Sequence, residues 1–582
     1  MSRSRSHFLF SILGLASALS VPYSSDSNPD AIQTAFHVHK PADLPHTDPT
    51  HSFWTHSPGA NPLAGEGSTG ALTDEADVCI IGSGITGVSA AYHLANAVQK
   101  GTFPILDAKQ KLRAVILEAR DFCKYYYCSG ATGRNGGNLT PYEFSGFSKV
   151  ESRLGREAAL RGYALEHYSA TEMVRLAREG GWADEVDLVE GGHLDVALTE
   201  ARLEEMKMDF TAAVAAGKSV NVSWLSREEM NATFGTYNWG VSSPGYNLWP
   251  LKFVTQLFKQ TLTIAPQQLD LRLHTRTPVT SVSPSSLTDS GTGRRWALTT
   301  ARGPVHCSTV LHATNGYASH LLPHMAGLGP AGIVPVRGQV IALRAAAPLD
   351  VLSKRSWVGN EGYWFPRPVT ETEQHPLVIL GGARTAAGPP FGTDVTDDGV
   401  VDEVVGSVLR DFLPMMFPGR YEPGREPEAE WTGIMGYTAL EIPFVGPVLG
   451  PRPNAPETEL EEVPYYKGQY IAAGYSGHGM PRAYACAEVV VQMIADEIAG
   501  RGVATAGVVP QAVFDMDAGC GGARAAVEMD VRNAPRRLII WIFRRWRGRV
   551  VALDVYVNLL ESCSRSSVTP PDHDFHPTFP DI

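Results

Sequence analysis

A glycine turn between an apolar run and a helix is the feature that most constrains the fold. In "ADVCIIGSGITGVSAAYHLANAV", the run Val78–Ile81 leads into the turn, and apolar and small residues then follow at helical spacing. The turn is Gly82, Ser83, Gly84, Ile85, Thr86 and Gly87, a G-x-G-x-x-G pattern between a strand and a helix. There Gly82 permits the tight turn, Gly84 lets the backbone approach a pyrophosphate, and Gly87 lets the helix pack on the strand. The sequence therefore predicts a dinucleotide site at this helix N-terminus.

An acidic residue ends the next expected strand. "RAVILEAR" (Arg113–Arg120) is typical of a short buried strand that ends at Glu118, followed by Ala119 and Arg120. A carboxylate in this place accepts hydrogen bonds from a ribose 2′-hydroxyl, which disfavours a 2′-phosphate. Its separation from the first glycine exceeds the ~20 residues usual for this fingerprint, and the polar stretch "QKGTFPILDAKQK" accounts for the excess as a loop. We expect Glu118, Ala119 and Arg120 to contact the cofactor.

The same scheme of strand, glycine turn and helix recurs near the other end of the chain, in "QYIAAGYSGHGMPRAYACAEVVVQMIADEI". Two such turns far apart predict one nucleotide-binding domain assembled from separate segments, to which "LRLHTRTPVTSV" and "HCSTVLHATNGY" add strands. "GGHLDVAL", "GQVIALRA" and "PLVILGGAR" predict strands of a second, substrate-facing domain. Helices are expected over Glu151–Gly180, Glu200–Ala216, Leu251–Ile264 and Val400–Phe412.

Charge and cysteine content exclude two classes of site. The net charge of −12 argues against nucleic-acid binding by bulk electrostatics. The seven cysteines are sparse, odd in number and without zinc spacing, so we expect neither a disulfide framework nor a metal site.

The N-terminal residues predict a leader and an arm. Residues 1–20 combine arginines, an apolar run and small residues before Val21, as in a secretory signal peptide, and the run is too short for a secure membrane span. The secretory pathway is the expected location if this peptide is real, and a cytoplasmic protein with a disordered or mis-annotated leader is the alternative. Residues 21–73 are rich in Pro, Ser, Thr and Gly and predict an extended N-terminal arm.

Several sequence blocks, in order from Asp74 to Ile498, resemble one family. "ARDFC…CSGATGRNGGN", "ATNGYASHLLP", "VPVRGQV", "WTGIMGY…IPFVGPV" and "GYSGHGM" resemble FAD-dependent oxidoreductases of the D-amino-acid oxidase/glycine oxidase/sarcosine oxidase superfamily, in its fungal branch. The resemblance implies an α/β fold: a discontinuous Rossmann-like FAD-binding domain (GR2-type) and an α+β substrate domain with a mixed or antiparallel sheet. The FAD-binding segments would be 74–150, 261–325 and 431–512, and the substrate segments 151–260 and 326–430.

The resemblance also implies a set of flavin-binding residues. They are Ala131, Thr132, Gly133, Arg134, Asn135, Gly136 and Gly137 along the loop, Val279 at the adenine end, and Gly477, His478, Gly479 and Met480 beside the pyrimidine ring. Glycines let the loop backbone lie against the ring, and Arg134 would supply positive charge near flavin or phosphate. At the second block, N–H groups and a helix N-terminus would face the negative charge that develops on reduction.

The implied activity is oxidation of a C–N bond in a small amine or amino acid. Hydride transfer to flavin N5 gives an imine, which water hydrolyses, and O2 as acceptor would release hydrogen peroxide. Such chemistry depends on positioning more than on a base, so the catalytic residue stays unassigned, with His478, Arg337 and Tyr363 as candidates. For His478, a packing and hydrogen-bonding role beside the flavin is favoured over proton transfer. Arg337, Tyr363, Trp364, Arg367 and Arg384 lie in segments that could face the substrate, where an arginine could bind a carboxylate.

Two departures from better-understood relatives bear on the activity. Met435 stands in "TGIMGYT", where monomeric sarcosine oxidases attach flavin through a cysteine, so we expect non-covalent FAD. "LVILGGAR" has no lysine where those enzymes carry an oxygen-activating one. A dehydrogenase with another electron acceptor, or a non-catalytic flavin-binding protein, therefore stays open beside the oxidase.

Two segments do not fit the resemblance. Lys124–Cys128 separates "ARDFC" from "SGATGRNGG", and both a retained intron fragment and a surface bulge explain it. The tail, residues 513–582, contains the basic and aromatic stretch "PRRLIIWIFRRWRGR". Either binding to an anionic membrane surface or mis-splicing of the gene explains this stretch. We assign the tail no function.

Overall fold

The structure is a computed structural model that describes residues 40–57, 62–104, 111–121, 130–285, 293–359, 362–452 and 465–501, and the short strands β19 (Arg545–Trp546) and β20 (Arg549–Val550). The predicted signal peptide, the insert Lys124–Cys128 and the rest of the tail lie outside these residues.

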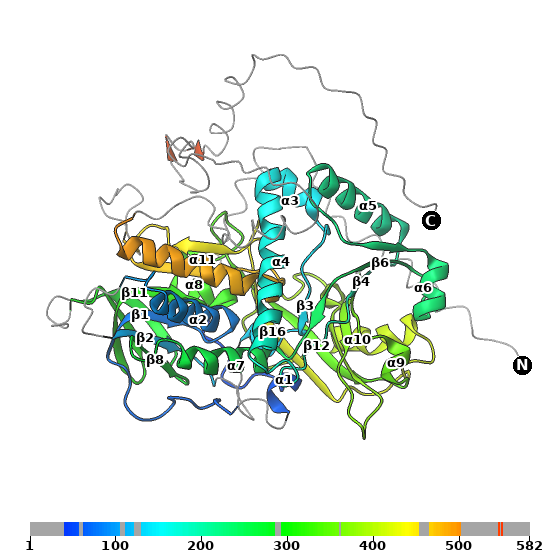
Figure 1. Ribbon diagram of the computed structural model, residues 1–582, viewed down its shortest axis with the longest axis horizontal. Helices are drawn as coiled ribbons and strands as arrows, with labels where there is room; N and C mark the ends of the chain where they lie inside the picture. The colour runs from blue at the N-terminus through cyan, green and yellow to red at the C-terminus, as the bar shows by residue number, and fades with distance from the viewer. Residues whose placement is uncertain are drawn as a thin grey trace, which may run out of the picture. The chain divides into compact units, whose positions relative to one another are not determined.

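The first sheet has β1 (Glu75–Ile81) near its centre (Figure 1). Its order is β17 (Phe444–Pro447), β18 (Gln469–Ala473), β11 (Gly303–His312), β1, β2 (Leu112–Leu117) and β8 (Leu269–His274), with β10 (Trp296–Thr300) and β9 (Val279–Pro284) joined to β11. Pairing is parallel from β8 through β2, β1 and β11 to β18. Parallel strands are covered on both faces, which explains their continuous apolar runs. These strands come from three separated parts of the chain, so the predicted discontinuous α/β fold is confirmed.

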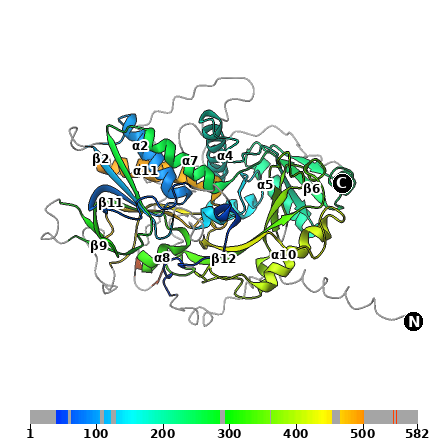
Figure 2. The same cartoon turned by 90° about the horizontal axis from the view of Figure 1, so that it is seen from below.

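Helices cover one face of the first sheet. α2 (Ile85–Gln99) packs against α7 (Pro250–Thr263) and α11 (Met480–Ile498), which Figure 2 shows together, and α4 (Arg156–Glu179) packs on α11. Val78 and Ile80 are buried on this helical side. On the opposite face, Cys79 and Ile81 are buried with apolar residues of β9, β10 and β11. The strand alternation therefore divides the domain core into two layers.

The second sheet is almost entirely antiparallel. Its order is β16 (Ala429–Tyr437), β12 (Val334–Arg344), β15 (Leu377–Gly382), β14 (Gly362–Pro366), β13 (Ser356–Val358), β4 (His193–Ala197), β6 (Trp239–Ser243) and β5 (Ser223–Leu225). Only β13 and β4 pair in parallel. α10 (Glu403–Met416) contacts β12 and β15, and apolar residues of this helix are buried against the sheet. This mixed sheet agrees with the predicted substrate domain.

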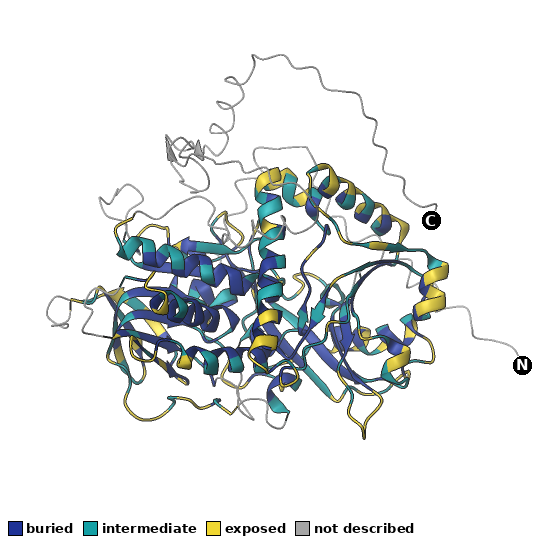
Figure 3. Cartoon of the chain, viewed as in Figure 1, coloured by how far each residue is buried: buried dark blue, intermediate teal, exposed yellow. Residues whose placement is uncertain are grey.

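Shorter elements complete the chain. They are α1 (Phe53–His56), α3 (Phe147–Leu154), α5 (Glu200–Ala215), α6 (Arg227–Phe234), α8 (Ala318–Leu321), α9 (Leu349–Leu352), β3 (Asn138–Leu139), β7 (Tyr246–Asn247) and the 3-10 turns Ala131–Gly133, Asn315–Tyr317, Pro323–Met325 and Arg384–Ala387. Exposed residues concentrate on α3, α5 and α6, whereas the strands of both sheets are largely buried (Figure 3). Both cores therefore lie along the sheets.

Two sequence boundaries differ from the structure. The helix expected over Glu151–Gly180 is two helices, α3 and α4, because Gly155 between them has a φ of 83°, outside the helical region. The predicted domain boundary between residues 430 and 431 falls inside β16, which pairs with β12 in the second sheet. The chain therefore returns to the first sheet after Tyr437, at β17.

One disulfide joins β1 and β11. Cys79 and Cys307, with Cα atoms 6.0 Å apart, are bonded across 228 residues of sequence. The sparse, odd cysteine count gave no sign of this pair, because only the parallel alignment of the two strands brings it together. Within the described ranges, no cluster of His, Cys, Asp and Glu could hold a metal ion. No helix in that part of the chain is long and apolar enough to cross a membrane.

Two glycine-to-alanine substitutions should change stability in opposite directions. Alanine favours a helix interior over glycine by about 1 kcal/mol, and Gly162 on α4 is exposed with open space around its Cα. A Cβ at Gly87 of α2 would instead clash with the Gly82 carbonyl oxygen. We expect Gly162→Ala to raise, and Gly87→Ala to lower, the free energy of unfolding measured in urea. A stabilising Gly87→Ala would contradict the close approach of α2 to the turn.

Candidate active site

A single cavity of about 650 Å³ collects most of the predicted cofactor residues. It is lined by Gly82, Gly84, Ile85, Thr86, Glu118, Ala119, Arg120, Ala131, Thr132, Arg134, Asn135, Gly136, Gly137, Val279, Gly477, His478, Gly479 and Met480. Ser83, Gly87 and Gly133 lie behind this wall, since they do not line the cavity. The cavity therefore brings together the two glycine turns and the loop 130–137, which are far apart in sequence. Contact of each residue with a cofactor stays a prediction.

The first glycine turn lies tightly against its neighbours. Gly82 has a φ of 104° and donates its N–H to the Leu117 carbonyl at 2.8 Å, and a Cβ there would lie 2.7 Å from the Ala313 oxygen. A Cβ at Gly84 would lie 3.1 Å from Thr132 Oγ1, which accepts the Ile85 N–H at 2.9 Å. The turn thus needs glycine both for its backbone conformation and for the approach of the loop 130–137.

Glu118 supports this turn from the end of β2. Its buried carboxylate accepts hydrogen bonds from Ser83 N at 2.9 Å, Ser83 Oγ at 2.8 Å and Arg120 N at 3.0 Å. One carboxylate therefore fixes the glycine turn and the start of the following segment relative to each other. Its predicted hydrogen bond to a ribose is untested.

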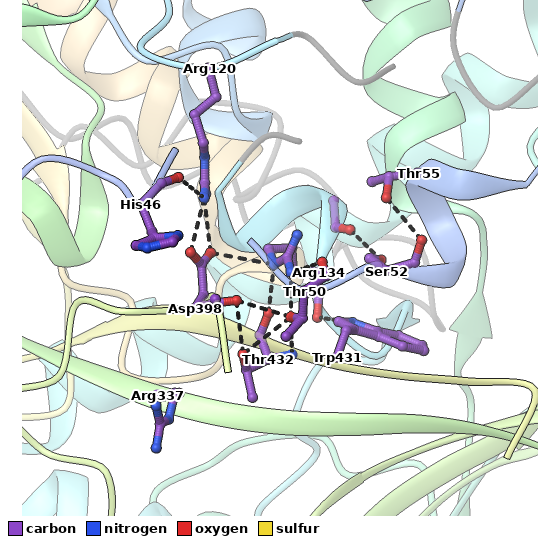
Figure 4. A network of polar contacts seen from close by, with 12 residues as sticks. His46, Thr50, Ser52, Thr55, Arg120, Arg134, Arg337, Asp398, Trp431 and Thr432 are labelled. Carbon is purple, nitrogen blue, oxygen red and sulfur yellow. Dashed lines mark hydrogen bonds and ion pairs between the residues drawn. The ribbon is translucent and has the colours of Figure 1, made fainter. Parts of the chain in front are cut away.

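A buried carboxylate, Asp398, lies between two of the predicted cofactor residues (Figure 4). Arg120 Nη1 donates to both Asp398 carboxylate oxygens at 3.0 Å, and Arg134 Nε lies 3.4 Å from Oδ2. The side chains of Asp398 and Arg134 are 0% exposed and that of Arg120 is 4% exposed. Burying a charge is costly unless it is paired and hydrogen-bonded, so the three groups depend on one another.

Arg134 is directed into this network. Its guanidinium also donates to the Thr432 carbonyl, to Thr50 Oγ1 at 2.7 Å and to the Thr50 carbonyl. From the sequence we expect Arg134 to place positive charge beside flavin or phosphate, which stays a prediction, and in the structure its charge is paired with Asp398. Arg134 lines the cavity and fixes the loop 130–137 to the second sheet.

A second buried carboxylate, Glu166 on α4, organises the other glycine block. It accepts from His478 Nε2 at 3.0 Å, Arg482 Nε at 2.8 Å and Tyr142 N at 2.9 Å. Burial alone would raise the pKa of Glu166, but His478 and Arg482 lower that pKa to about 2. Burial lowers the pKa of His478, and the Tyr142 ring stacks on its imidazole with centroids 3.8 Å apart. These contacts fix His478 in position and agree with its packing interpretation.

The second sheet and segments outside its strands contribute side chains to the rest of the cavity wall. Tyr142, His193, Tyr363, Arg384, Met435 and Tyr437 line it. The Tyr363 ring lies so close to Gly136 and Gly381 that a Cβ at either would clash with it. The Arg384 guanidinium lies over the Tyr437 ring at 5.0 Å, and no acidic side chain of the described residues pairs with it. This wall offers one cation and several aromatic rings to a small ligand.

Three of the proposed substrate-side residues lie elsewhere. Arg337 donates weakly to the Asp397 carbonyl at 3.4 Å and is directed away from the network in Figure 4. Trp364 is 2% exposed in the core of the second sheet, and Arg367 pairs with Asp187 and lies over the Trp249 ring. Of the three catalytic candidates, His478 and Tyr363 line the cavity and Arg337 does not.

Sequence reasoning missed Tyr142, Glu166, His193 and Asp398. Glu166 carried a signal, because it interrupts the face of α4 that buries Tyr163, Ala170 and Met173. Asp398 lies in "TDDG" among other acidic residues, and the others stand in segments without a motif.

The residues present fit a dinucleotide cofactor. The N-cap of α2, Gly84, has no side chain to cap the helix. Thr132 Oγ1 accepts the Ile85 N–H, and the first turn of the helix lines the cavity, where a helix N-terminus suits a phosphate. Arg120 Nε and Nη2 are buried and, among the described residues, have no hydrogen-bond acceptor. Of the described cysteines, Cys79 and Cys307 are bonded to each other and Cys486 is buried, and none lines the cavity, whereas Met435 does. The described part of the wall thus presents hydrogen-bond donors to a dinucleotide, and it contains no thiol that could bond to the flavin.

Comparison with known proteins identifies the family. A family model described as FAD dependent oxidoreductase matches residues 77–493, so the chain belongs to this family and its cofactor is FAD, held non-covalently as is usual there. The chain is 25% identical over 422 residues to the probable oxidoreductase OrdL of Rhizobium meliloti (strain 1021), which covers 72% of this chain and 83% of that protein. None of the comparisons tests the predicted fungal branch.

Solved structures show the same fold at low identity. Glycine oxidase from Geobacillus kaustophilus matches with a TM-score of 0.50 and 18% identity, over 74% of this chain and 99% of that one. L-amino acid deaminase from Proteus myxofaciens in complex with anthranilate matches with a TM-score of 0.52 and 16% identity, over 78% of this chain and 95% of that one.

Removing the shared carboxylate should destabilise the protein strongly. Asp398→Asn would leave the buried charges of Arg120 and Arg134 without their counter-ion, so we expect the free energy of unfolding in urea to fall by about 3–5 kcal/mol. The matched control is Asp397→Asn, because Asp397 is half exposed and lies 4.0 Å from His46. If Asp397→Asn lowered the free energy of unfolding as much as Asp398→Asn, the special role of the buried ionic group would be contradicted.

His193 should make stability depend on pH. Burial, helped by His478 and Arg355, lowers its pKa to about 3, so folding favours the neutral ring. That contribution is fully present above the unfolded pKa of about 6.5 and is lost as pH falls towards 3, by at most about 1.4 kcal/mol per pH unit. In the His193→Gln variant, the free energy of unfolding in urea should depend less on pH between pH 6 and 4 than in the wild type. The control is His375→Gln, because His375 is exposed. An equal loss of pH dependence in the control would contradict this account.

Proposed function

We propose that this FAD-dependent oxidoreductase oxidises the C–N bond of a small amino acid or amine. The observation that carries the proposal is the shared cavity, which is lined both by most of the predicted flavin-binding residues and by Arg384, a cation with no acidic partner among the described residues. The two main-chain blocks, 82–87 and 477–480, belong to the first sheet and its helices. Tyr363 and Tyr437 reach the cavity from β14 and β16 of the second sheet, and Arg384 reaches it from the 3-10 turn that follows β15.

Each group on the substrate side has a chemical task in this proposal. Arg384 binds the carboxylate of an amino acid, because a guanidinium recognises a carboxylate through paired hydrogen bonds. Tyr363 and Tyr437 exclude water and restrict the orientation of the α-carbon. Bound FAD supplies the acceptor for the hydride of the substrate α-carbon. The neutral amine that has lost a hydride is an iminium ion, which releases a proton to water as the imine, and water hydrolyses the imine to a carbonyl compound and the free amine or ammonia.

His478 positions groups in this proposal and is not a base. Its Nε2 is engaged with Glu166 and its ring with Tyr142. Hydride transfer from a neutral amine requires alignment more than proton abstraction.

The electron acceptor is O2 in the favoured form of the proposal, with hydrogen peroxide as product. A dehydrogenase that uses another acceptor is the second candidate, because β15 (Leu377–Gly382) and the residues around it in "LVILGGAR" contain no lysine. Peroxide formation separates the two: an oxidase releases it at the rate of substrate turnover, and a dehydrogenase does not.

Anaerobic absorption spectroscopy tests the proposed reaction. Amino acids and amines would be added in pools to the purified protein, and bleaching of the oxidised flavin bands by at least one pool is expected. A decarboxylated analogue of each active amino acid tests the role of the carboxylate. Flavin bands that no pool bleaches would contradict C–N oxidation of small amines and leave a flavin-binding protein.

Arg384→Ala should weaken the binding of amino-acid substrates selectively. Loss of a hydrogen bond to a charged group costs roughly 1.5–3 kcal/mol, so KM for an amino acid should rise roughly 10- to 150-fold, with less change in kcat. KM for the decarboxylated amine should not change. The control is Arg337→Ala, an arginine of β12 that does not line the cavity. An equal rise in KM for the amino acid in both variants would contradict the assignment of Arg384 as the carboxylate-binding residue.

A further inference from the structure

Residues 41–57, called the N-terminal segment below, take part in the cavity although the family match begins only at residue 77. Leu44 and Pro45 line the cavity together with residues of the first sheet. The segment was expected to be an extended arm, and its only described helix is the four-residue α1. Nothing in the family match accounts for this part of the wall.

Hydrogen bonds hold Leu44 and Pro45 in place from both sides. Before them, Ala42 N donates to Ser319 Oγ at 2.9 Å, and the Ala42 carbonyl lies 3.0 Å from His320 Nδ1. After them, the His46 carbonyl accepts from Arg120 Nη1 at 3.3 Å (Figure 4). Both anchors are parts of the cavity wall, since His320 and Arg120 line it. Leu44 and Pro45 therefore form the part of the cavity wall between α8 and the end of β2.

The same segment holds the loop 130–137 through two buried side chains. Ser52 Oγ donates to the Gly133 carbonyl at 2.7 Å, and Trp54 Nε1 donates to the Asn135 carbonyl at 2.6 Å. Both side chains belong to residues that are 0% exposed. The Trp54 ring also lies against Gly137, where a Cβ would approach Cζ2 to 3.0 Å. The loop backbone therefore takes its position partly from the N-terminal segment.

Thr50 connects the segment to the Asp398 network. Its N–H donates to the Asp398 carbonyl at 2.8 Å, and its Oγ1 accepts from Arg134 Nη2 at 2.7 Å and from Thr432 N at 2.9 Å. The segment is thus bonded to the second sheet, to the loop 130–137, to α8 and to Arg120, which follows β2 of the first sheet.

We infer that the N-terminal segment completes the FAD site: Leu44 and Pro45 form part of the wall that covers the bound dinucleotide, and Ser52 and Trp54 position the loop 130–137 against it. Docking of the segment then slows release of FAD. The inference concerns cofactor retention, so it does not depend on which substrate the enzyme oxidises.

The test measures FAD dissociation from the full-length holoprotein, followed by the rise in fluorescence of free FAD after dilution. The double variant Ser52→Ala/Trp54→Phe removes both hydrogen bonds to the loop and keeps an aromatic ring at 54. Because each lost hydrogen bond contributes modestly, we expect the dissociation rate to rise about tenfold.

Two controls remove equivalent bonds that do not reach the loop. Ser57→Ala removes a hydroxyl that donates to the Phe53 carbonyl within the segment at 2.7 Å. Trp296→Phe removes an indole bond to the Lys467 carbonyl at 3.2 Å, from a tryptophan that is also 0% exposed but lies outside the cavity wall. Both controls should keep the wild-type dissociation rate.

A second measurement uses the unaltered protein, so it does not depend on a variant that folds. Coupling between two binding events is reciprocal, so a segment that slows FAD release must itself be held more firmly when FAD is bound. Amide hydrogen exchange of residues 41–57 should therefore be slower in the holoprotein than in the protein stripped of FAD. The inference is wrong if the double variant releases FAD at the wild-type rate, or if exchange in this segment is unaffected by FAD.

Discussion

The buried carboxylate of Asp398 joins the parts of the chain on which the cavity depends. Its two partners come from the end of β2 and from the loop 130–137, and its main chain bonds to Thr50 and Thr432. These charges are almost completely buried, so each is tolerated only because the others are present. Four segments that are distant in sequence are thus fixed around one side of the cavity by a single ionic group.

The two sheets contribute different chemistry to the cavity. The first sheet supplies glycine turns and helix N-termini, which present main-chain N–H groups that suit a phosphate-containing cofactor. The second sheet supplies aromatic rings, and the turn after β15 supplies Arg384, which in the proposed function binds the carboxylate of a small substrate. Two buried carboxylates, Glu118 and Glu166, each support one glycine block from behind. The division explains why an enzyme whose cofactor performs the chemistry needs few reactive side chains of its own.

Local patterns were predictable from the sequence and long-range pairings were not. The glycine turn, Glu118 and the helix at Met480 follow from short-range spacing, and the structure has each element where the pattern indicates. Asp398 gave no signal, because its partners are hundreds of residues away and its neighbours in sequence are also acidic. The Cys79–Cys307 disulfide required the alignment of β1 with β11. Charge patterning also has a limit: the helical charge pattern continues across Gly155, but the backbone conformation of that residue ends one helix before the next begins.

The flavin content of the purified, folded chain tests the central claim most directly. The protein would be denatured, and the released flavin would be identified and quantified against protein concentration. The account predicts one FAD for each folded chain, all of it released because no covalent bond holds it. A folded chain that carries no flavin, and takes up none when FAD is added, would contradict the assignment of this cavity as a cofactor site.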